Sequence, residues 1–368
     1  MAAPYSSLVL ITGASGHIGY ATLVQALTAG YQVRAAVRSP AKASLILSRP
    51  QIKAINPGPR LEFVMVPDIT RPNAYEDAIK GVDYVIHIAS PLVTGDQIPL
   101  SQHQEFFVKP AVRGTIGMLE AAQKSRTVQR VVITSSIVAL MPVVHMEGVE
   151  KRTTPVRPDD RTDFIEEPYE SEFTAYAASK VAALHATEAW IASQDPDFDV
   201  IHLHPGFVLG RNEIATTTVE SMKGTNAVVL AMLLGKKFGP FAGATVHVQD
   251  VARVHVQSLQ PTVPGNQSYI LSQPARWNDA KEIAKHAFPE AVERRILTGS
   301  GNVDTTDVPI DSSLTERVFG IRLQSFESQV KSLVGHFLEL RSRKPSPSIS
   351  HGATVRGKSR PQHVKASA

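Results

Sequence analysis

The sequence predicts an α/β fold in which a doubly wound parallel sheet carries a smaller C-terminal lobe. Short apolar runs, which suit strands buried on both faces, alternate with helical patterns as far as His204. A glycine-rich turn joins the first run to the first helix, and polar side chains follow several later runs directly. Beyond residue 210 the alternation loosens, which indicates a second, smaller unit.

Length and composition support one large domain with an added lobe. The chain has 368 residues, and 43% of them are hydrophobic, enough for a sizeable core. The absence of cysteine excludes disulfides and thiolate metal sites. It also fits a reducing compartment, and we expect a cytoplasmic protein. No apolar stretch approaches the ~18 residues of a membrane span, so none is expected.

The basic residues are concentrated at the C-terminus. The sequence pI is about 9.2, but residues 341–368 hold seven Lys and Arg and no acid. Without them the chain has 31 Lys and Arg against 34 Asp and Glu, a net charge of −3. A nucleic-acid partner is therefore not expected. The tail has few large apolar side chains, so we expect disorder, with a partner- or surface-binding role as the alternative.

The first apolar run, residues 7–12, predicts a central strand, and a helical pattern follows its glycine-rich turn to about Ala29. Glycines let the backbone approach a pyrophosphate, and the N-terminus of the helix favours its charge. The spacing is GxxGxxG rather than GxGxxG, and the alternative is an ordinary loop. We expect a dinucleotide to bind this turn at Gly13, Ser15, Gly16, His17, Ile18 and Gly19.

The second strand, residues 32–38, ends in Arg38, and Lys42 lies one turn into the next helix. At this position an acid would accept from the 2′-hydroxyl of NAD, whereas an arginine suits the 2′-phosphate of NADP. Arg38 and Lys42 therefore predict NADPH/NADP+ as the cofactor. The alternative is a solvated surface arginine.

The third and fourth strands, residues 61–66 and 83–88, end in residues that suit the same cofactor. Asp68 and Ile69 follow the third strand, and Asp68 is expected to accept from the adenine amino group. Such strand ends face the cofactor crevice of a doubly wound sheet. The fourth strand is followed by residues expected to pass along the ribose and pyrophosphate, Ala89, Ser90 and Pro91. A long helix is predicted over about 102–124.

Candidate catalytic side chains follow the fifth strand, residues 130–134. Ser135 and Ser136 come directly after it, where a hydroxyl can donate to a carbonyl oxygen or simply form a turn. Tyr176 and Lys180 lie four apart at the start of a predicted helix, hence on one face. An ammonium stabilises a phenolate, whose phenol has an ordinary pKa of about 10. We interpret the pair as a general acid/base pair; the alternative is an ordinary exposed Tyr and Lys.

The sixth strand, residues 199–204, is the last of the regular alternation. We predict an NADP-binding domain over residues 1–210, to which the chain returns at about 245–260, and a mainly substrate-binding lobe over 211–340. Asp250 is expected to cap a helix to about Leu259. Other elements are expected at 218–235, 245–248, 267–271, 278–288, 311–319 and 326–340. His202 and His204 share one face of the sixth strand, but no third ligand is apparent, so no metal site is expected.

These segments, in this order, resemble the extended short-chain dehydrogenase/reductase superfamily, which has a Rossmann-type sheet. Within it the chain is similar to the group of dihydroflavonol reductase, cinnamoyl-CoA reductase and fungal aldehyde (methylglyoxal) reductase. The resemblance covers about residues 8–330. The matching stretches are 12–19, 37–38, 66–69, 87–91, 134–136, Tyr176–Lys180, 204–210 and 246–252.

The resemblance implies a role for each matching residue. Tyr176 would donate the proton to the carbonyl oxygen, and Lys180 would bind the nicotinamide ribose and lower the pKa of Tyr176. The second serine is usually the catalytic one in this family, so Ser136 is preferred to Ser135. The substrate would touch the loop after Pro91, the segment around Met141 and the stretch after Arg211. Four residues would line the nicotinamide, Pro205, Gly206, Phe207 and Val208.

The chain departs from the family pattern at three positions. Arg113 stands near Gly114 where relatives often have an asparagine, so no role is expected for it. Gln249 replaces a common arginine before Asp250, which puts an ion pair that anchors the lobe in doubt. Arg211 replaces a proline, which would alter the substrate loop.

The sequence thus predicts an NADPH-dependent carbonyl reductase acting on a small-molecule ketone or aldehyde, as a monomer or homodimer. One alternative is a hydroxysteroid-type dehydrogenase or a sugar-nucleotide epimerase, and Arg38 argues against the epimerase. Another is a non-catalytic NADP-binding regulator, against which the complete set of Ser136, Tyr176 and Lys180 argues. The identity of the substrate does not follow from the sequence.

Overall fold

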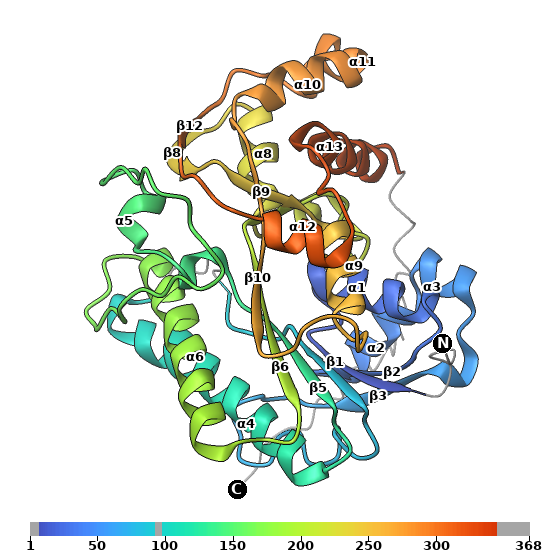
Figure 1. Cartoon of the computed structure of the whole chain (residues 1–368). Coiled ribbons are helices and arrows are strands. Elements are labelled where there is room, and N and C mark those ends of the chain that lie inside the picture. The colour runs from blue at the N-terminus through green and yellow to red at the C-terminus, as the bar shows by residue number, and fades with distance from the viewer. Residues whose placement is uncertain (1–6, 93–97, 344–368) are drawn as a thin grey trace, which may run out of the picture.

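The computed structural model describes residues 7–92 and 98–343, and a seven-stranded parallel sheet forms its centre (Figure 1). The strand order is β10-β6-β5-β4-β1-β2-β3, and each neighbouring pair is parallel. The doubly wound α/β fold predicted from the sequence is confirmed. The strands are β1 (Leu8–Thr12), β2 (Gln32–Val37), β3 (Leu61–Met65), β4 (Tyr84–His87), β5 (Arg130–Thr134), β6 (Asp199–Pro205) and β10 (Gln267–Leu271).

Helices cover both faces of this sheet, because each central strand is apolar on both faces. On β1, Val9 and Ile11 enter one core and Leu10 enters the other, as the alternation of side chains along a strand requires. The first core is covered by α1 (His17–Thr28), α2 (Pro40–Leu47), α3 (Pro50–Ile55), α9 (Val248–Gln257) and α12 (Ser313–Phe319). The second is covered by α4 (Lys109–Ser125) and α6 (Glu172–Gln194).

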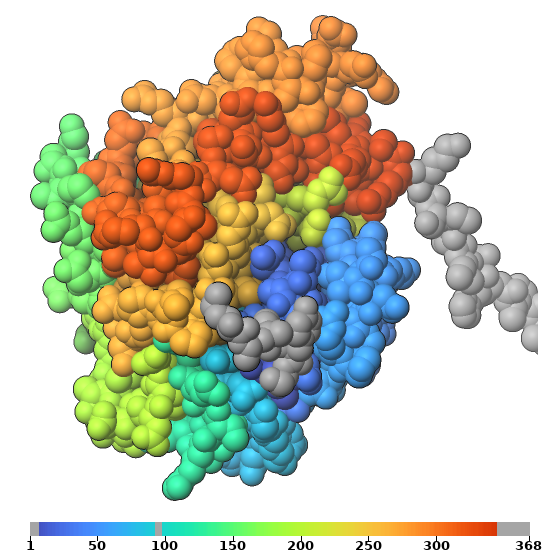
Figure 2. All heavy atoms as spheres, turned by 45° about the vertical axis from the view of Figure 1, so that its right-hand side comes forward, coloured from blue at the N-terminus to red at the C-terminus, as the bar shows by residue number. Residues whose placement is uncertain are grey.

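The lobe lies over the carboxyl ends of the strands, and Figure 2 shows its orange and red helices across the top of the molecule from a second side. Its core surrounds Trp277, which is completely buried. It has two small sheets, β11-β9-β7 and β12-β8. The strands are β7 (Phe207–Leu209), β8 (Lys237–Ala242), β9 (Ala244–His247), β11 (Gln273–Pro274) and β12 (Asn302–Thr306). The helices are α7 (Thr218–Ser221), α8 (Asn226–Leu233), α10 (Asp279–Ala287), α11 (Pro289–Glu293) and α13 (Phe326–Ser342).

The chain returns to the main sheet over a longer segment than the predicted 245–260. Strand β10 pairs with β6 as the seventh strand of the sheet, although we had predicted a mainly substrate-binding lobe over these residues. Helix α9 packs against α1 on one face of the same sheet. The division into a cofactor domain and a substrate lobe remains a proposal.

Two predicted helices differ in detail. Asp250 does not cap α9: the cap is His247, whose Nδ1 accepts from the Gln249 amide at 3.0 Å. Asp250 lies in the first turn, where its carboxylate is also favourable. The helix predicted over 218–235 is two helices, α7 and α8, because Gly224 between them has φ +64°.

Two expectations concern segments that the structure covers only in part. Helix α13 ends at Ser342, and the basic tail beyond residue 343 lies outside the described residues, so its disorder remains a prediction. Within the described residues, no helix combines the length and the apolar character needed to cross a membrane.

Candidate active site

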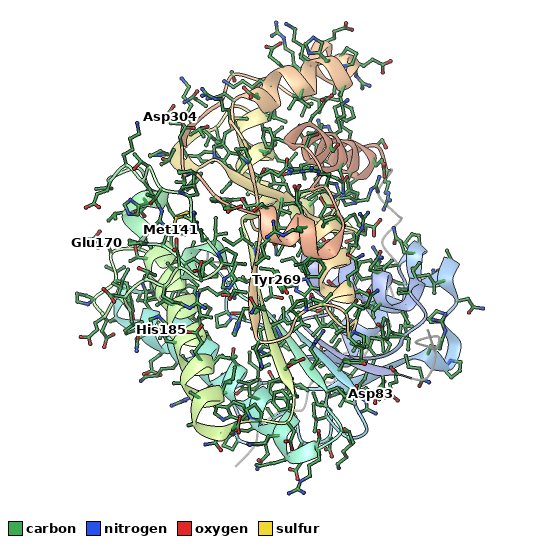
Figure 3. The ribbon with its side chains drawn as sticks, in the orientation of Figure 1. Asp83, Met141, Glu170, His185, Tyr269 and Asp304 are labelled. Carbon is green, nitrogen blue, oxygen red and sulfur yellow. The ribbon has the colours of Figure 1, made fainter. Side chains whose placement is uncertain are left out.

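The structure brings Ser136, Tyr176 and Lys180 together at the carboxyl end of β5. Ser136 is the second residue after β5, and α6 carries Tyr176 and Lys180 on the face toward the sheet. The Ser136 hydroxyl lies beside the phenol of Tyr176, and its side-chain interaction with the phenol is one of the causes that act on the pKa of Tyr176. The Lys180 ammonium lies 5.8 Å from the centre of the Tyr176 ring. Figure 3 labels Met141 near this end of the sheet and Asp83 at the opposite end.

Helix α6 begins where it does because Ser171 caps it. The Ser171 hydroxyl accepts from the Thr174 amide at 3.1 Å, and Glu172 adds a negative charge in the first turn. This start places Tyr176 in the second turn and Lys180 one turn later, so both side chains project toward the same strand ends.

Lys180 is buried and is held by two groups from the strand ends. Its Nζ donates to the Ser90 hydroxyl and to the Thr134 carbonyl oxygen, both at 3.2 Å. The side chain is 6% exposed, and burial lowers the pKa of Lys180 to about 8. The ammonium is therefore still the main form near neutrality, but little free energy separates it from the neutral amine.

Tyr176 does not have the lowered pKa that the family resemblance implied. Burial raises the pKa of Tyr176 to about 12, and the hydrogen bond from Ser136 offsets only part of this rise. The reason is that the ammonium of Lys180 donates to Ser90 and Thr134 rather than to the phenol oxygen. Tyr176 is therefore protonated at neutral pH, the form that can give a proton to a carbonyl oxygen.

The glycine-rich turn has the geometry that a pyrophosphate needs. Gly13 has φ +72°, and a Cβ there would lie 2.9 Å from the Ala89 amide nitrogen. A Cβ on Gly19 would lie 2.0 Å from the Gly13 carbonyl oxygen, so only glycine lets α1 pack this closely on the turn. Helix α1 has no side-chain cap and no acid in its first turn, which leaves its first amides available to an anion. The residues present therefore fit a dinucleotide.

Thr12 ties this turn to the end of β4. Its Oγ1 accepts from the amides of Ile88 and Ala89, both at 3.1 Å, and shares a hydrogen bond of 3.0 Å with His87 Nδ1. Ser15, Gly16 and Ser90 are all at least partly exposed beside this junction. The structure thus brings together the predicted residues of the turn and of the fourth strand end.

The two basic residues predicted to bind the 2′-phosphate are exposed beyond the carboxyl end of β2. Arg38 follows β2 and forms no hydrogen bond or ion pair with any described residue, so its guanidinium is available to a ligand. Lys42 lies in the first turn of α2 and is exposed as well.

Asp68 and Ile69 already have partners within the protein. Asp68 accepts from the amide and the hydroxyl of Thr70, and these bonds are the main cause of its lowered pKa. Ile69 packs against Gly114 on α4, where a Cβ would lie 2.9 Å from its Cδ1. Asp68 is partly exposed, and one of its oxygens, Oδ2, accepts no hydrogen bond from Thr70 and lies 3.6 Å from Arg71.

The segment predicted to line the nicotinamide joins the sheet to the lobe. Pro205 ends β6, and the Gly206 amide donates to the Leu271 carbonyl at 3.0 Å. The Phe207 ring lies edge-on to Trp277, with centroids 5.2 Å apart, so this side chain is part of the lobe core. Val208 is buried in the core of the main sheet.

Two departures from the family pattern have replacement contacts. Arg211 forms a bidentate ion pair with Glu339 of α13, which ties the loop after Gly210 to the last helix. Asp250 accepts from the amide of Gln324 at 2.7 Å and from its side chain at 3.0 Å. A neutral partner thus anchors the lobe without an arginine at position 249.

Sequence reasoning missed His204, which lies directly behind Ser136. The strand pattern drew attention to His202 and His204 only as metal ligands. The structure instead gives His204 hydrogen bonds to Ser136 and Ser268. Within the described residues, no group of three His, Asp or Glu side chains is placed to hold a metal ion.

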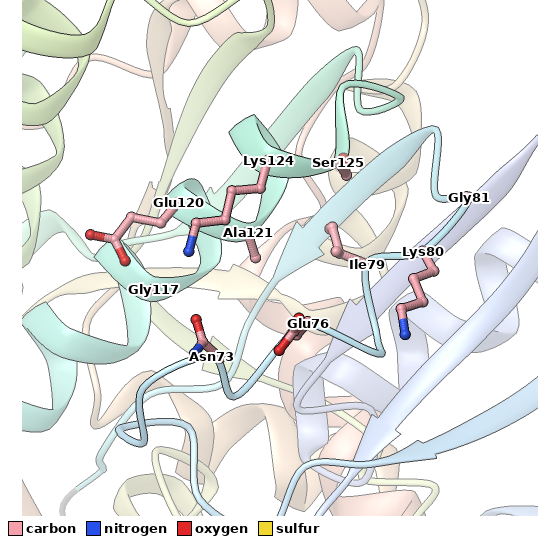
Figure 4. A pocket seen from close by; sticks show the side chains of 10 residues that line it. All are labelled: Asn73, Glu76, Ile79, Lys80, Gly81, Gly117, Glu120, Ala121, Lys124 and Ser125. Atoms are coloured by element: carbon pink, nitrogen blue, oxygen red, sulfur yellow. The ribbon is translucent and has the colours of Figure 1, made fainter.

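A surface pocket of about 370 Å³ lies elsewhere, between the segment 73–81 and the end of α4 (Figure 4). Lys80, Lys124, Glu76 and Glu120 are among its lining residues, so both signs of charge are present. These segments precede β4 and β5, whereas Ser136 follows β5. The pocket is therefore at the opposite end of the sheet from the candidate active site.

Comparisons of sequence find relatives over nearly the whole chain. Residues 9–271 match the model of the NAD dependent epimerase/dehydratase family. Ketoreductase CTB6 of Cercospora nicotianae is 39% identical over 94% of this chain and 98% of its own length. NAD-dependent epimerase/dehydratase FUM13 of Gibberella moniliformis is 33% identical over 90% of this chain and 96% of its own length.

Solved structures share the fold at lower identity. Yeast methylglyoxal/isovaleraldehyde reductase Gre2, complexed with NADPH, superposes with a TM-score of 0.79 at 21% identity, covering 92% of this chain and all of that one. Vestitone reductase from alfalfa gives 0.67 at 22% identity, covering 91% of this chain and 99% of that one.

Proposed function

Because the chain belongs to the NAD-dependent epimerase/dehydratase family of extended short-chain dehydrogenases/reductases and is an NAD(P)-dependent oxidoreductase, we propose that it is an NADPH-dependent carbonyl reductase. The observation that carries this proposal is the contact of Ser136 with a protonated Tyr176, one helical turn from a buried Lys180. A ketone is the favoured substrate, because relatives such as CTB6 are named ketoreductases.

Each side chain of the set has a distinct task in this proposal. Bound NADPH supplies the hydride for the carbonyl carbon. The Ser136 hydroxyl holds the carbonyl oxygen, and Tyr176 gives it the proton that completes the alcohol. Lys180 holds the nicotinamide ribose and stabilises the phenolate that remains, until a proton from solvent restores the phenol.

We propose the lobe over 211–340 as the substrate side of the site. Met141 is completely buried in an apolar cluster that also includes Phe207 and Tyr176, so the carbonyl group would meet an apolar surround. The Arg211–Glu339 ion pair would fix the loop beside it. Residues 93–97, in the loop after Pro91, lie outside the described residues.

The test is NADPH consumption over a panel of aldehydes, diketones, aryl ketones and acyl-CoA thioesters, with the alcohol product identified. Turnover of a ketone or aldehyde with NADPH is expected. Tight NADPH binding without turnover of any carbonyl compound would favour a regulator. Interconversion of sugar nucleotides without net NADPH loss would favour an epimerase. Oxidation of a hydroxysteroid with NADP+, without turnover of the panel, would favour that dehydrogenase.

Arg38→Ala is expected to raise the Michaelis constant for NADPH by about ten- to a hundred-fold, the range for lost hydrogen bonds to a charged group. The planar guanidinium binds a phosphate through two parallel bonds, and NADH has no 2′-phosphate. Kinetic constants for both cofactors, at one ionic strength, measure the effect because such contacts depend on salt.

Lys42→Ala is the matched control for this prediction, since Lys42 carries an exposed charge close to the same strand end. It is expected to have the smaller effect, because an ammonium acts as a point charge rather than as a fork. Equal losses with NADPH and NADH in the Arg38 variant would contradict the prediction, as would a wild-type preference for NADH.

A further inference from the structure

His204 connects three neighbouring strands behind the candidate active site. It lies on β6 and is completely buried. Its Nδ1 is 3.1 Å from the backbone carbonyl oxygen of Ser136, and its Nε2 is 3.1 Å from the Ser268 hydroxyl of β10. Ser136 and Ser268 are themselves only 8% exposed, so water does not compete for these bonds.

The chemistry of the partners fixes the direction of both hydrogen bonds. A carbonyl oxygen only accepts, so Nδ1 of His204 must carry the hydrogen. Burial lowers the pKa of His204 to about 3, so the ring is neutral and Nε2 has no hydrogen. Nε2 therefore accepts from the hydroxyl of Ser268. Ser268 thus selects the tautomer of His204 that can donate to Ser136.

The ladder of backbone hydrogen bonds between β5 and β6 ends beside His204, and the His204 side chain provides a donor where the ladder stops. The Ser135 amide donates to the Leu203 carbonyl at 2.8 Å. In a parallel ladder the next bond would come from the amide of residue 205, but Pro205 has no N–H. The carbonyl oxygen of Ser135 therefore receives no hydrogen bond from the backbone of β6. The imidazole of His204 instead provides a donor from its side chain, and this donor reaches the backbone carbonyl oxygen one residue later.

The position of the Ser136 backbone matters because its hydroxyl contacts Tyr176. Ser136 is the cap of a short 3₁₀ turn, Ile137–Ala139, and its Oγ also lies 3.4 Å from the Val138 amide. A shift of the Ser136 carbonyl would rotate this residue and move its hydroxyl. We propose that His204 and Ser268 are a positioning pair that fixes Ser136 in reach of Tyr176 and of the substrate oxygen. The proposal rests on the carbonyl reductase function proposed above.

The matched variants His204→Asn and His204→Gln test this proposal. They carry the same amide, but an asparagine places its donor near the Nδ1 position, whereas a glutamine places it near Nε2. His204→Gln is expected to lower kcat by about ten- to a hundred-fold, as a misplacement of about 1 Å at a reacting group can. His204→Asn is expected to keep most of the wild-type kcat. Affinity for NADPH, measured by fluorescence titration, should stay unchanged in both, because the cofactor loops keep their own contacts.

Two further measurements separate positioning from a general packing role. When Ser136 is already replaced by alanine, the added change His204→Gln is expected to lower kcat only a little further. The reason is that the hydroxyl that His204 positions is already absent. Ser268→Ala removes one hydroxyl at the rim of the network, so it tests the pair if the His204 variants do not fold. Its kcat is expected to fall, by less than that of His204→Gln.

Several results would overturn the proposal. Wild-type kcat in His204→Gln or Ser268→Ala would do so, as would equal rates for the Asn and Gln variants. If His204→Gln lowered kcat as strongly in the Ser136→Ala variant as in the wild type, His204 would act on another group. If instead Ser136→Ala and Tyr176→Phe kept full activity, the roles given to these residues in the proposed function would be wrong. This result differs from all of those that would overturn the positioning role of His204 and Ser268.

Discussion

Replacement of Tyr176 by phenylalanine is expected to lower kcat by about 10²–10⁴-fold, the usual contribution of a general acid. The change removes only the phenolic hydroxyl and keeps the ring, which packs against the buried apolar cluster that contains Met141. The pKa of Tyr176, raised to about 12 by burial, means that the phenol keeps its proton throughout the neutral range. Single-turnover rates with saturating NADPH would measure the loss.

The affinity for NADPH is the control for this variant. Neither the glycine-rich turn nor Arg38 depends on the phenol, so the dissociation constant is expected to change little. Ser136→Ala is a useful companion, because it removes the hydrogen bond that reaches Tyr176 and leaves the donor in place. More than half of the wild-type turnover in Tyr176→Phe would show that another group donates the proton.

Acid is expected to unfold the protein cooperatively between about pH 6 and pH 4, because several histidines are buried in neutral form. Burial lowers the pKa of His87 and His204 to about 3, and that of His202 and His255 to about 4. Unfolded chains titrate at about 6.5, so below that pH only the unfolded state takes up these protons. Stability is therefore full above about pH 6.5 and is lost as the pH falls.

Each such histidine contributes a slope of up to about 1.4 kcal/mol per pH unit to the free energy of unfolding. Urea midpoints at a series of pH values would measure the combined slope. His202→Leu is the diagnostic variant, because Nε2 of His202 is buried and has no hydrogen-bond partner among the described residues, so its loss breaks no such bond. The slope of the unfolding free energy against pH is expected to be smaller in this variant, by the amount that corresponds to about one proton. A wild-type stability that is flat between pH 7 and pH 5 would contradict the prediction.

The main sheet was predictable because its central strands are buried on both faces. The apolar runs 8–11 and 131–133 are continuous, and glycine or serine comes one residue after the threonine that ends each strand. Of the lobe strands, β9 was predicted at 245–248, but β8 was not, because it contains Gly239 and Pro240 and alternates irregularly between exposed and buried residues. Such a sequence has the composition of a turn, and only its pairing with β12 makes it a strand.

The candidate site divides in the same way. Tyr176 and Lys180 were predicted from their spacing on one helix, and the pair Ser135 and Ser136 from its place after a strand, which are local properties. The family resemblance selected Ser136 from that pair. The raised pKa of Tyr176 was not predicted, since it depends on how the lobe and the strand ends bury the phenol. The role of His204 was not predictable either, because Ser136 and Ser268 each lie more than sixty residues away along the chain.

The late arrival of β10 and α9 has a consequence for biosynthesis. A nascent chain that has reached residue 210 already holds the glycine-rich turn, Ser136, Tyr176 and Lys180. It still lacks β10, so β6 would be an open edge strand, and it lacks α9, so the apolar face of α1 would be exposed to water. The ribosome must pass residue 271 before these surfaces are covered. The N-terminal half therefore cannot mature ahead of the rest, as successive domains of a longer protein do.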